Sequence, residues 1–172
     1  SNIDEIIRAY IIKGKSHGKG QVIWPDGSLY TGHWENGYFQ GEGTFIWSNG
    51  DKYEGQWKRD RMQGRGVYLF SDWRKYVGQW QEDQMHGEGI YYWPNGEKYE
   101  GDFVFGLYHG KGTYSWPDGK VYCGAWEQSF RHGVGRMAWP DGRIYEGQWV
   151  QDLRQGEGEM TEEETPLEED QM

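Results

Sequence analysis

A tyrosine recurs every 23 residues through most of the chain, and this fixed period constrains the fold more than any other feature. Each tyrosine is followed two residues later by Gly and four residues later by Trp or Phe. A Gly-x-Gly segment and a further aromatic residue follow at constant phase, without an insertion. The tyrosines are Tyr30, Tyr53, Tyr76, Tyr99, Tyr122 and Tyr145. A short, fixed period of this kind indicates a repeat array rather than a globule around one deep core.

Within each copy, the alternation of residue types predicts two β-strands. In the first full copy, residues 30–34 read Tyr-Thr-Gly-His-Trp and residues 41–47 read Gly-Glu-Gly-Thr-Phe-Ile-Trp. Most copies end in Asp-Gly or Asn-Gly, which favour tight hairpin turns because these residues tolerate positive φ. The other connection, at 35–40, is short and polar. We therefore expect an all-β meander of antiparallel hairpins.

The same alternation assigns the two faces of the sheet. Rings and glycines share one face, whereas Thr31, His33 and Glu42 lie on the other. The chain has 28 Gly, 11 Trp and 13 Tyr. Bare glycines leave space in which a neighbouring ring can lie on the backbone, so a single layer can be stable with few aliphatic residues. One face is predicted to be a ladder of rings.

These residues resemble the MORN (membrane occupation and recognition nexus) repeat. The resemblance depends on Tyr-Glu-Gly-Gln-Trp at 53–57 and 145–149 and on His-Gly-x-Gly at 86–89, 109–112 and 132–135, and it covers about residues 14–158. It implies an elongated, curved single-layer antiparallel sheet of about seven repeats. It also implies a non-catalytic scaffold for cytoskeletal, ciliary or membrane-junction assemblies, which binds a partner's helix or extended peptide in a concave groove.

The two ends differ from the array. Residues 1–13 are predicted to form an N-terminal cap, and both a degenerate strand and a short helix fit their pattern. Residues 159–172 contain seven acidic residues and no basic one, which predicts a disordered tail. The alternatives are that this tail recruits a basic partner or lies over the groove. The net charge is -10, but the remainder carries 21 acidic and 18 basic residues. This balance argues against nucleic acid or an anionic membrane as the main partner.

The rings in the middle and C-terminal half are the predicted partner-binding groove. They are Trp80, Tyr91, Trp93, Phe103, Tyr114, Trp116 and Trp126. Apolar residues in otherwise polar connections are candidate specificity contacts, with packing against the neighbouring connection as the alternative. They are Tyr38, Phe39, Phe105, Leu107 and Tyr108. Trp73 stands where a turn glycine is expected, which predicts that its hairpin cannot use an ordinary Asp-Gly turn.

Several motifs that could indicate catalysis or ligand binding have structural explanations. Residues 9–16 fit a relaxed phosphate-loop pattern, but a strand rather than a helix should follow them. Histidines that share one repeat phase lie about 9.6 Å apart in adjacent copies, too far to share a zinc ion. Cys123 faces outward with no histidine of unique phase near it, and as the lone cysteine it fits a reducing, cytoplasmic setting. We expect no enzyme, no cofactor and no metal site.

The leading hypothesis is therefore a protein-binding scaffold in the cytoplasm, associated with the cytoskeleton or a cilium. The second is a peripheral membrane adaptor that binds acidic phospholipids, for which the cluster Lys58, Arg59, Arg61 and Arg65 is the densest basic segment. The third is a self-assembling array or homodimer, in which the open sheet edges pair two copies.

Overall fold

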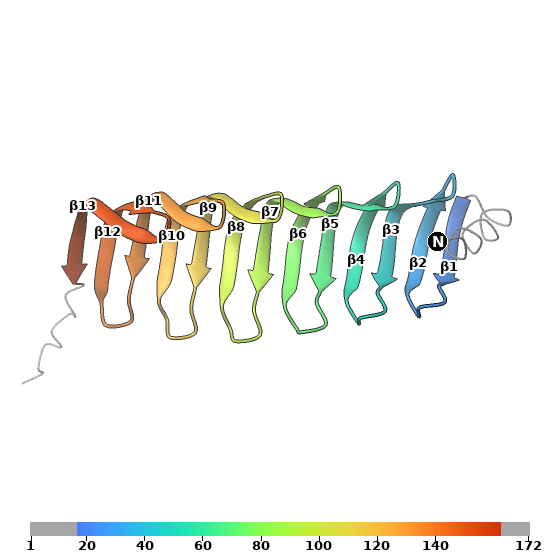
Figure 1. Cartoon of the computed structure of the whole chain (residues 1–172), viewed down its shortest axis with the longest axis horizontal. Helices are drawn as coiled ribbons and strands as arrows, with labels where there is room; N and C mark the ends of the chain where they lie inside the picture. The colour runs from blue at the N-terminus through green and yellow to red at the C-terminus, as the bar shows by residue number, and fades with distance from the viewer. Residues whose placement is uncertain (1–16, 163–172) are drawn as a thin grey trace, which may run out of the picture.

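Thirteen β-strands form one antiparallel sheet and follow one another across it in sequence order. This computed structural model describes residues 17–162, with the backbone alone at 153 and 155–162. The strands are β1 (His17–Ile23), β2 (Leu29–Glu35), β3 (Tyr38–Ile46), β4 (Lys52–Lys58), β5 (Arg61–Leu69), β6 (Lys75–Gln81), β7 (Gln84–Tyr92), β8 (Lys98–Val104), β9 (Leu107–Ser115), β10 (Val121–Glu127), β11 (Phe130–Ala138), β12 (Arg143–Val150) and β13 (Leu153–Glu162). Figure 1 shows them side by side in a single layer. The predicted all-β meander is confirmed.

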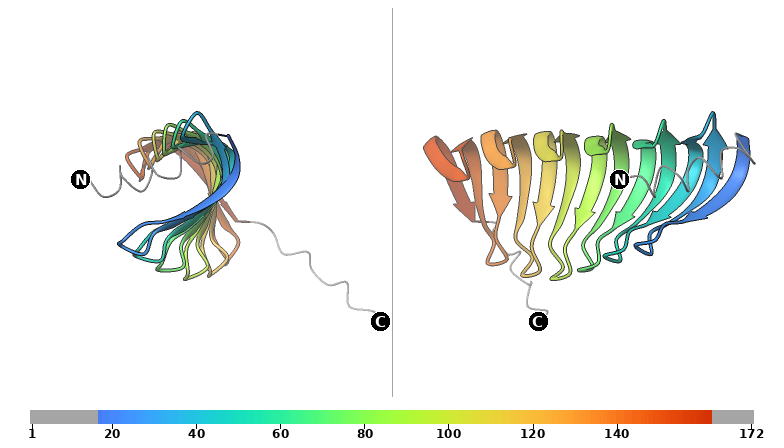
Figure 2. Two further views of the ribbon diagram at one scale, coloured as in Figure 1. Left: turned by 90° about the vertical axis from the view of Figure 1, so that its right-hand side faces the viewer. Right: turned by 45° about the vertical axis from the view of Figure 1, so that its right-hand side comes forward.

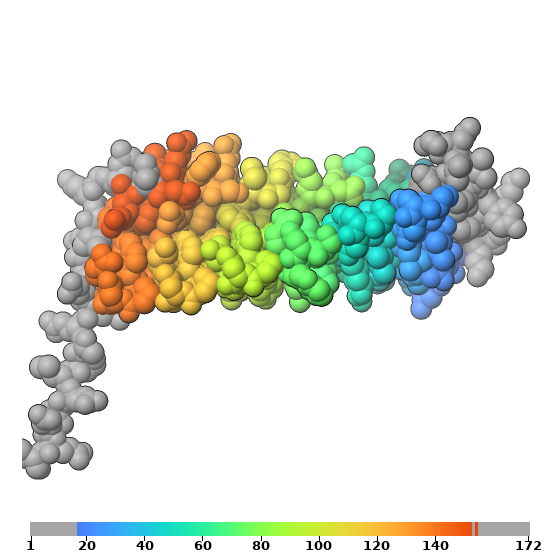
Figure 3. Space-filling model, turned by 60° about the horizontal axis from the view of Figure 1, so that its bottom comes forward, coloured from blue at the N-terminus to red at the C-terminus, as the bar shows by residue number. Residues whose placement is uncertain are grey.

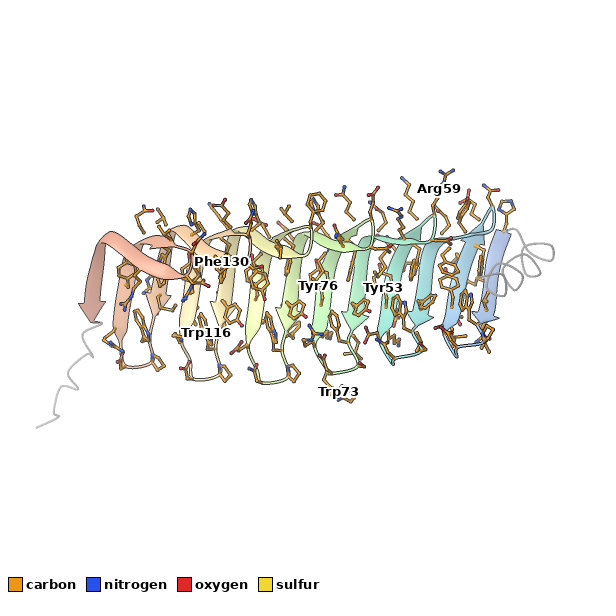
Figure 4. The ribbon with its side chains drawn as sticks, viewed as in Figure 1. Tyr53, Arg59, Trp73, Tyr76, Trp116 and Phe130 are labelled. Atoms are coloured by element: carbon orange, nitrogen blue, oxygen red, sulfur yellow. The ribbon has the colours of Figure 1, made fainter. Side chains whose placement is uncertain are left out.

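The sheet curls about its long axis, so that its cross-section is an open arc (Figure 2). Side chains alternate between the inner and the outer face of this arc. In β4, Tyr53 and Trp57 are buried on the inner face, whereas Glu54 and Gln56 are exposed on the outer face. Figure 4 shows Tyr53 and Tyr76 on the inner side. The predicted separation of rings and polar residues onto opposite faces is confirmed.

The hairpins that join one repeat to the next close with a recurring turn. In the first, the Gly27 amide donates to the Trp24 carbonyl at 3.0 Å. The Asp26 carboxylate accepts the Ser28 amide at 2.8 Å, which explains the Asp or Asn before the glycine. Figure 3 shows the tips of these hairpins as a row along the array.

Trp73 adopts the same turn, so the prediction that it would exclude this turn is wrong. Its amide donates to the Phe70 carbonyl at 3.0 Å, as the Gly50 amide donates to Trp47 at 3.0 Å. Its φ is +73°, in the left-handed region that costs a non-glycine residue about 1–2 kcal/mol. The strands paired on either side impose this conformation. The indole is 75% exposed and lies at the tip of the hairpin (Figure 4).

The connections at the other edge are two-residue turns with positive φ at both positions, for example +47° at Arg59 and +69° at Asp60. This is the type I′ geometry, which suits the twist of paired strands. The Asp60 carboxylate accepts the Phe39 amide at 2.8 Å, and the Asp60 amide donates to the Phe39 carbonyl at 3.2 Å. Asp83 binds Met62 of the repeat before it in the same way. A backbone hydrogen bond of this kind attaches five of these turns to the preceding repeat, and they are the turns at 59–60, 82–83, 105–106, 128–129 and 151–152.

Two hydrogen bonds recur in the buried layer of the inner face. The Tyr53 hydroxyl donates to the Gln56 carbonyl at 2.8 Å, three residues along the same strand. The Trp57 indole N–H donates to the Gly43 carbonyl at 2.9 Å, on the neighbouring strand β3. Buried polar groups require such partners, and here the indole bond also links neighbouring strands. Phe103 cannot make the second bond because it lacks the indole N–H.

A row of glycines runs across the sheet, each paired in register with the next. Gly55 lies between Gly43 and Gly66, and the Tyr53 ring lies on Gly66. A Cβ atom on Gly66 would overlap the Tyr53 hydroxyl and ring carbons. The predicted packing of rings on bare glycine backbone is therefore confirmed, and it explains why these positions exclude side chains.

The predicted end of the array at residue 158 needs correction, because β13 continues to Glu162. Residues 159–162, assigned to the tail from their charge, pair with β12 from Glu146 to Arg143. The backbone pairing of these residues with β12 therefore prevails over the preference of an acidic segment for disorder. The predicted N-terminal cap at 1–13 and the remaining tail lie outside the described residues. Among residues 17–162, no helix is long and apolar enough to span a bilayer.

Candidate functional site

A chain of nine aromatic rings follows the inner face along the side of the repeat-joining turns, and we call it the ring ladder. Its members are Trp24, Phe45, Trp47, Tyr68, Phe70, Tyr91, Trp93, Tyr114 and Trp116. Successive ring centroids are 4.4–6.0 Å apart, which is contact distance for aromatic pairs. All but Tyr91 are partly exposed. The ladder is a continuous apolar track over β1–β9.

A deeper layer of rings supports the ladder. Tyr53 and Tyr76 are fully buried, and the Trp80 ring lies edge-on to both, 5.4 and 5.0 Å from their centroids. The Tyr68 ring of the ladder lies 5.8 Å from that of Trp80. The exposed track therefore stands on buried rings that fix its position.

Polar groups between repeats hold the tyrosines of the ladder in place. The Tyr68 hydroxyl donates to Asp51 at 2.6 Å, and the Tyr114 hydroxyl donates to Glu97. Burial, together with the Asp51 carboxylate, raises the pKa of Tyr68. Arg74 instead donates to the Tyr91 hydroxyl at 2.9 Å. These bonds set the orientations of the three rings.

The ladder changes character after Trp116, because Met137 takes the place of the next ring. Cations then lie over the remaining rings. The Lys120 ammonium is 4.3 Å from the Trp116 ring, and the Arg143 guanidinium is 5.3 Å from the Trp139 ring. Such cation–π contacts hold positive charge at a ring face. A cation also lies in the middle of the ladder, where the Arg74 guanidinium is 4.3 Å from the Phe70 ring. Cations over rings are therefore more numerous at the C-terminal end but are not confined to it.

The family comparison follows the same period. The MORN repeat model matches seven segments, at residues 12–29, 30–52, 53–73, 76–98, 99–121, 122–142 and 145–161. The chain belongs to the MORN repeat family. Its MORN array is a single open antiparallel sheet of seven repeats. No curated protein sequence matches the chain.

The MORN array is similar to the TCP domain of SAS-4 (dCPAP) of Drosophila melanogaster, solved in complex with a proline-rich motif of Ana2 (dSTIL). The identity is 17%, the TM-score is 0.50, and the match covers 84% of this chain and 83% of that chain. The Danio rerio CPAP TCP10 domain, with a STIL peptide, has 15% identity and a TM-score of 0.23 over 80% and 95% of the two chains. Virginiamycin B lyase from Staphylococcus aureus has 10% identity and a TM-score of 0.24 over 89% and 57%. Of these three structures, the SAS-4 TCP domain alone has a TM-score that supports a comparison of folds.

The seven predicted groove rings fall into two groups. Trp93, Tyr114 and Trp116 belong to the ring ladder and are partly exposed. The other four are buried, and they are Trp80, Tyr91, Phe103 and Trp126. Tyr91 nevertheless connects two exposed members of the ladder. The four buried rings cannot present a surface themselves, because neighbouring repeats of the MORN array cover them.

The candidate specificity contacts also divide. Phe39 and Tyr108 pack into the core, stacked on Tyr30 and Tyr99 respectively, each with centroids 3.8 Å apart. For these two, packing within the array is the structural role. Three remain exposed along the edge of the type I′ turns, and they are Tyr38, Phe105 (62% exposed) and Leu107.

Sequence reasoning missed several exposed residues. The N-terminal members of the ladder share their repeat phase with Trp93 and Tyr114, so the period alone could have identified them. They are Trp24, Phe45, Trp47, Tyr68 and Phe70. Phe130 is also exposed. It lies along the edge of the sheet formed by the type I′ turns, the edge that also carries Arg59 (Figure 4). The sequence could have identified Phe130, because it is an apolar residue at the same repeat position as Tyr38, at the start of β11.

The histidine and cysteine positions have local explanations. His86 Nδ1 accepts the Phe105 amide at 3.3 Å, which supports the predicted structural role of the histidine before glycine. Cys123 is exposed. No group of three or more metal-ligating side chains occurs within residues 17–162. The basic segment borders a depression of about 480 Å³ that Glu82 also lines, and Glu82 pairs with Arg61 at 3.7 Å.

Proposed function

We propose that this MORN array is a non-catalytic protein–protein interaction scaffold that binds a segment of a partner protein along the ring ladder. The observation that carries the proposal is a row of nine contacting rings, eight of them partly exposed, on one face of a sheet that is open to solvent. Tryptophan and tyrosine dominate binding energy at protein interfaces. A segment lying across the strands would contact several repeats without needing a deep pocket.

The repeat spacing favours an extended partner segment over a helical one. Adjacent repeats lie two strands apart, about 9.6 Å. A polyproline II helix advances about 9.3 Å in each turn of three residues, so every third residue would meet an equivalent ring pair. An α-helix has a pitch of about 5.4 Å and matches this spacing poorly. The solved complex of the SAS-4 TCP domain with a proline-rich motif is consistent with an extended ligand.

The greater number of cations at the C-terminal end of the ladder than at Phe70 favours one orientation of such a segment. Lys120 and Arg143 lie over the rings at the C-terminal end. Acidic residues of the partner should therefore lie over Trp116 and Trp139, and apolar or proline residues over Trp47 to Trp93. The setting that we propose with this function is cytoplasmic, in a cytoskeletal or ciliary assembly, as the resemblance implied.

The test is binding of a labelled peptide of about twelve residues with proline at every third position and two glutamates at one end. Trp93→Ala combined with Trp116→Ala should weaken binding at least about tenfold, since each is an exposed aromatic contact. The matched control is Trp73→Gly, which removes an exposed indole away from the ladder. Circular dichroism confirms that each variant is folded.

Three results would contradict the proposal. The first is equal binding of the peptide by the ladder variant and the parent chain. The second is equal binding of a composition-matched scrambled peptide. The third is salt-sensitive flotation of the chain with anionic vesicles and no peptide binding, which would favour the membrane adaptor instead.

A further inference from the structure

The outer face carries an apolar interruption at its centre. Val67, Val77 and Ile90 lie in register on β5, β6 and β7, in one line across three strands. The equivalent positions on either side are polar, with Glu54 on β4 and Glu100 on β8. All three aliphatic side chains are partly exposed on the face opposite the ring ladder. This strip plays no part in the proposed peptide site.

The charges beside this strip form a pattern centred on β6. In the neighbouring line of outer-face residues, Arg65 on β5 and Glu88 on β7 lie on either side of Gln79. Further out on the same line, Glu42 lies on β3 and Lys111 lies on β9, where its amide donates to Asp102 of β8. These two residues are each three strands from β6. Both pairs have opposite charge about the same strand, whereas the pair between them, Gln56 on β4 and Asp102 on β8, is neutral on one side and acidic on the other. When a second copy of the chain is rotated by 180° about β6, each basic residue of these pairs therefore faces an acidic residue of the other copy.

We propose that the outer face binds the outer face of a second copy of this chain, around a two-fold axis parallel to β6. The rotation places β5 of one copy on β7 of the other. Val77 then meets Val77 of the second copy, and Val67 meets Ile90. Arg65 meets Glu88, and Glu42 meets Lys111. Each contact occurs twice, as an isologous interface requires.

The remaining charges are compatible with this arrangement. Glu54 would face Glu100 of the second copy, but each already pairs with a lysine of its own strand. Lys52 lies 3.5 Å from Glu54, and Lys98 lies 3.5 Å from Glu100. A shallow depression of about 340 Å³ between Arg65, Val77 and the acidic side chains gives the second copy space to approach.

The expected interface is small. Seven strands at about 4.8 Å, with a strip about 13 Å wide, give roughly 440 Å² on each copy, or roughly 900 Å² in total. Stable complexes usually bury about 1,200–2,000 Å². We therefore expect a weak dimer, present at micromolar or higher concentration and sensitive to salt.

Sedimentation velocity of the full chain tests this, from about 1 to about 200 µM. The parent chain should show a concentration-dependent dimer that weakens in about 0.5 M salt. Val77→Glu should abolish it. Arg65→Glu and Glu88→Arg should each weaken it at least about tenfold, and the double variant should restore it to near the parent level. Ile23→Glu, at a 63% exposed outer-face position near the array's end, is the matched control and should leave it unchanged.

Three outcomes would overturn the proposal, and the first two are a monomer throughout the concentration range and a double charge reversal that fails to restore the dimer. A dimer that survives Val77→Glu would also overturn it, and would point to pairing through the sheet edges. Peptide binding at the ring ladder should be unchanged in Val77→Glu, which separates this inference from the proposed function.

Discussion

Replacing Gly66 by alanine tests why the repeat requires glycine beneath each tyrosine. The Cβ of the variant would overlap the Tyr53 hydroxyl and ring, and Tyr53 is 0% exposed with no free space into which to move. Overpacking of this kind costs about 1–3 kcal/mol. Displacing the ring also breaks the hydrogen bond to the Gln56 carbonyl, worth about 0.5–1.5 kcal/mol. Alanine also restricts the unfolded chain more than glycine does, and this stabilises the folded variant by about 0.5 kcal/mol.

The net expectation is a loss of about 2.5 kcal/mol in the free energy of unfolding, or about 5–10 °C in the melting temperature. Urea and thermal unfolding followed by circular dichroism measure it. Gly20→Ala is the matched control, since Gly20 has the same repeat phase but meets only the Trp34 indole, at 3.2 Å. Its effect should stay within about 1 kcal/mol. If Gly66→Ala were as stable as the parent chain, or if Gly20→Ala were equally damaging, the packing argument would be refuted.

Three further predictions concern the same framework. Trp73→Gly should raise the free energy of unfolding by about 1–2 kcal/mol in chemical denaturation, because glycine adopts the left-handed turn without strain; no gain would show that the turn is unstrained. Trp126→Phe should cost about 1 kcal/mol through loss of the indole bond to the Gly112 carbonyl, and a neutral result would mean that this bond adds nothing. Burial raises the pKa of Tyr122 to about 12, so its neutral form stabilises the fold. This tyrosine contribution should be constant below about pH 10, the pKa of tyrosine in the unfolded chain, and stability should fall by about 1.4 kcal/mol per pH unit for each such tyrosine between pH 10 and 12. The tyrosinate absorbance of the buried tyrosines and the circular dichroism signal should then change together, and ionisation of these buried tyrosines near pH 10 without unfolding would contradict this.

Much of the candidate site could be predicted from the period. Trp93, Tyr114 and Trp116 were placed on a ring-lined face by alternation alone, and they are members of the exposed ladder. Trp80 and Phe103 share that face, yet they are buried. Alternation specifies which face a residue occupies, but it does not specify how deeply the neighbouring repeat covers it.

The turns show a similar limit. The glycine position of the repeat-joining hairpins was evident from Asp-Gly and Asn-Gly, but the geometry at Trp73 was not. A local preference of about 1–2 kcal/mol is smaller than the energy of the paired strands that flank the turn. The binding of Asp60 to the preceding repeat could not be foreseen either, because it joins residues 21 apart through backbone placement.

The sequence by itself determined the period, the two strands in each repeat, their faces and the need for glycine where rings lie on the backbone. These follow from local geometry, since alternation and turn preference act over a few residues. The tertiary structure alone decided which rings are covered, where the array ends and which charges lie opposite one another across β6. Those features depend on strand register and on the curl of the whole sheet, which arise only when all the repeats pair.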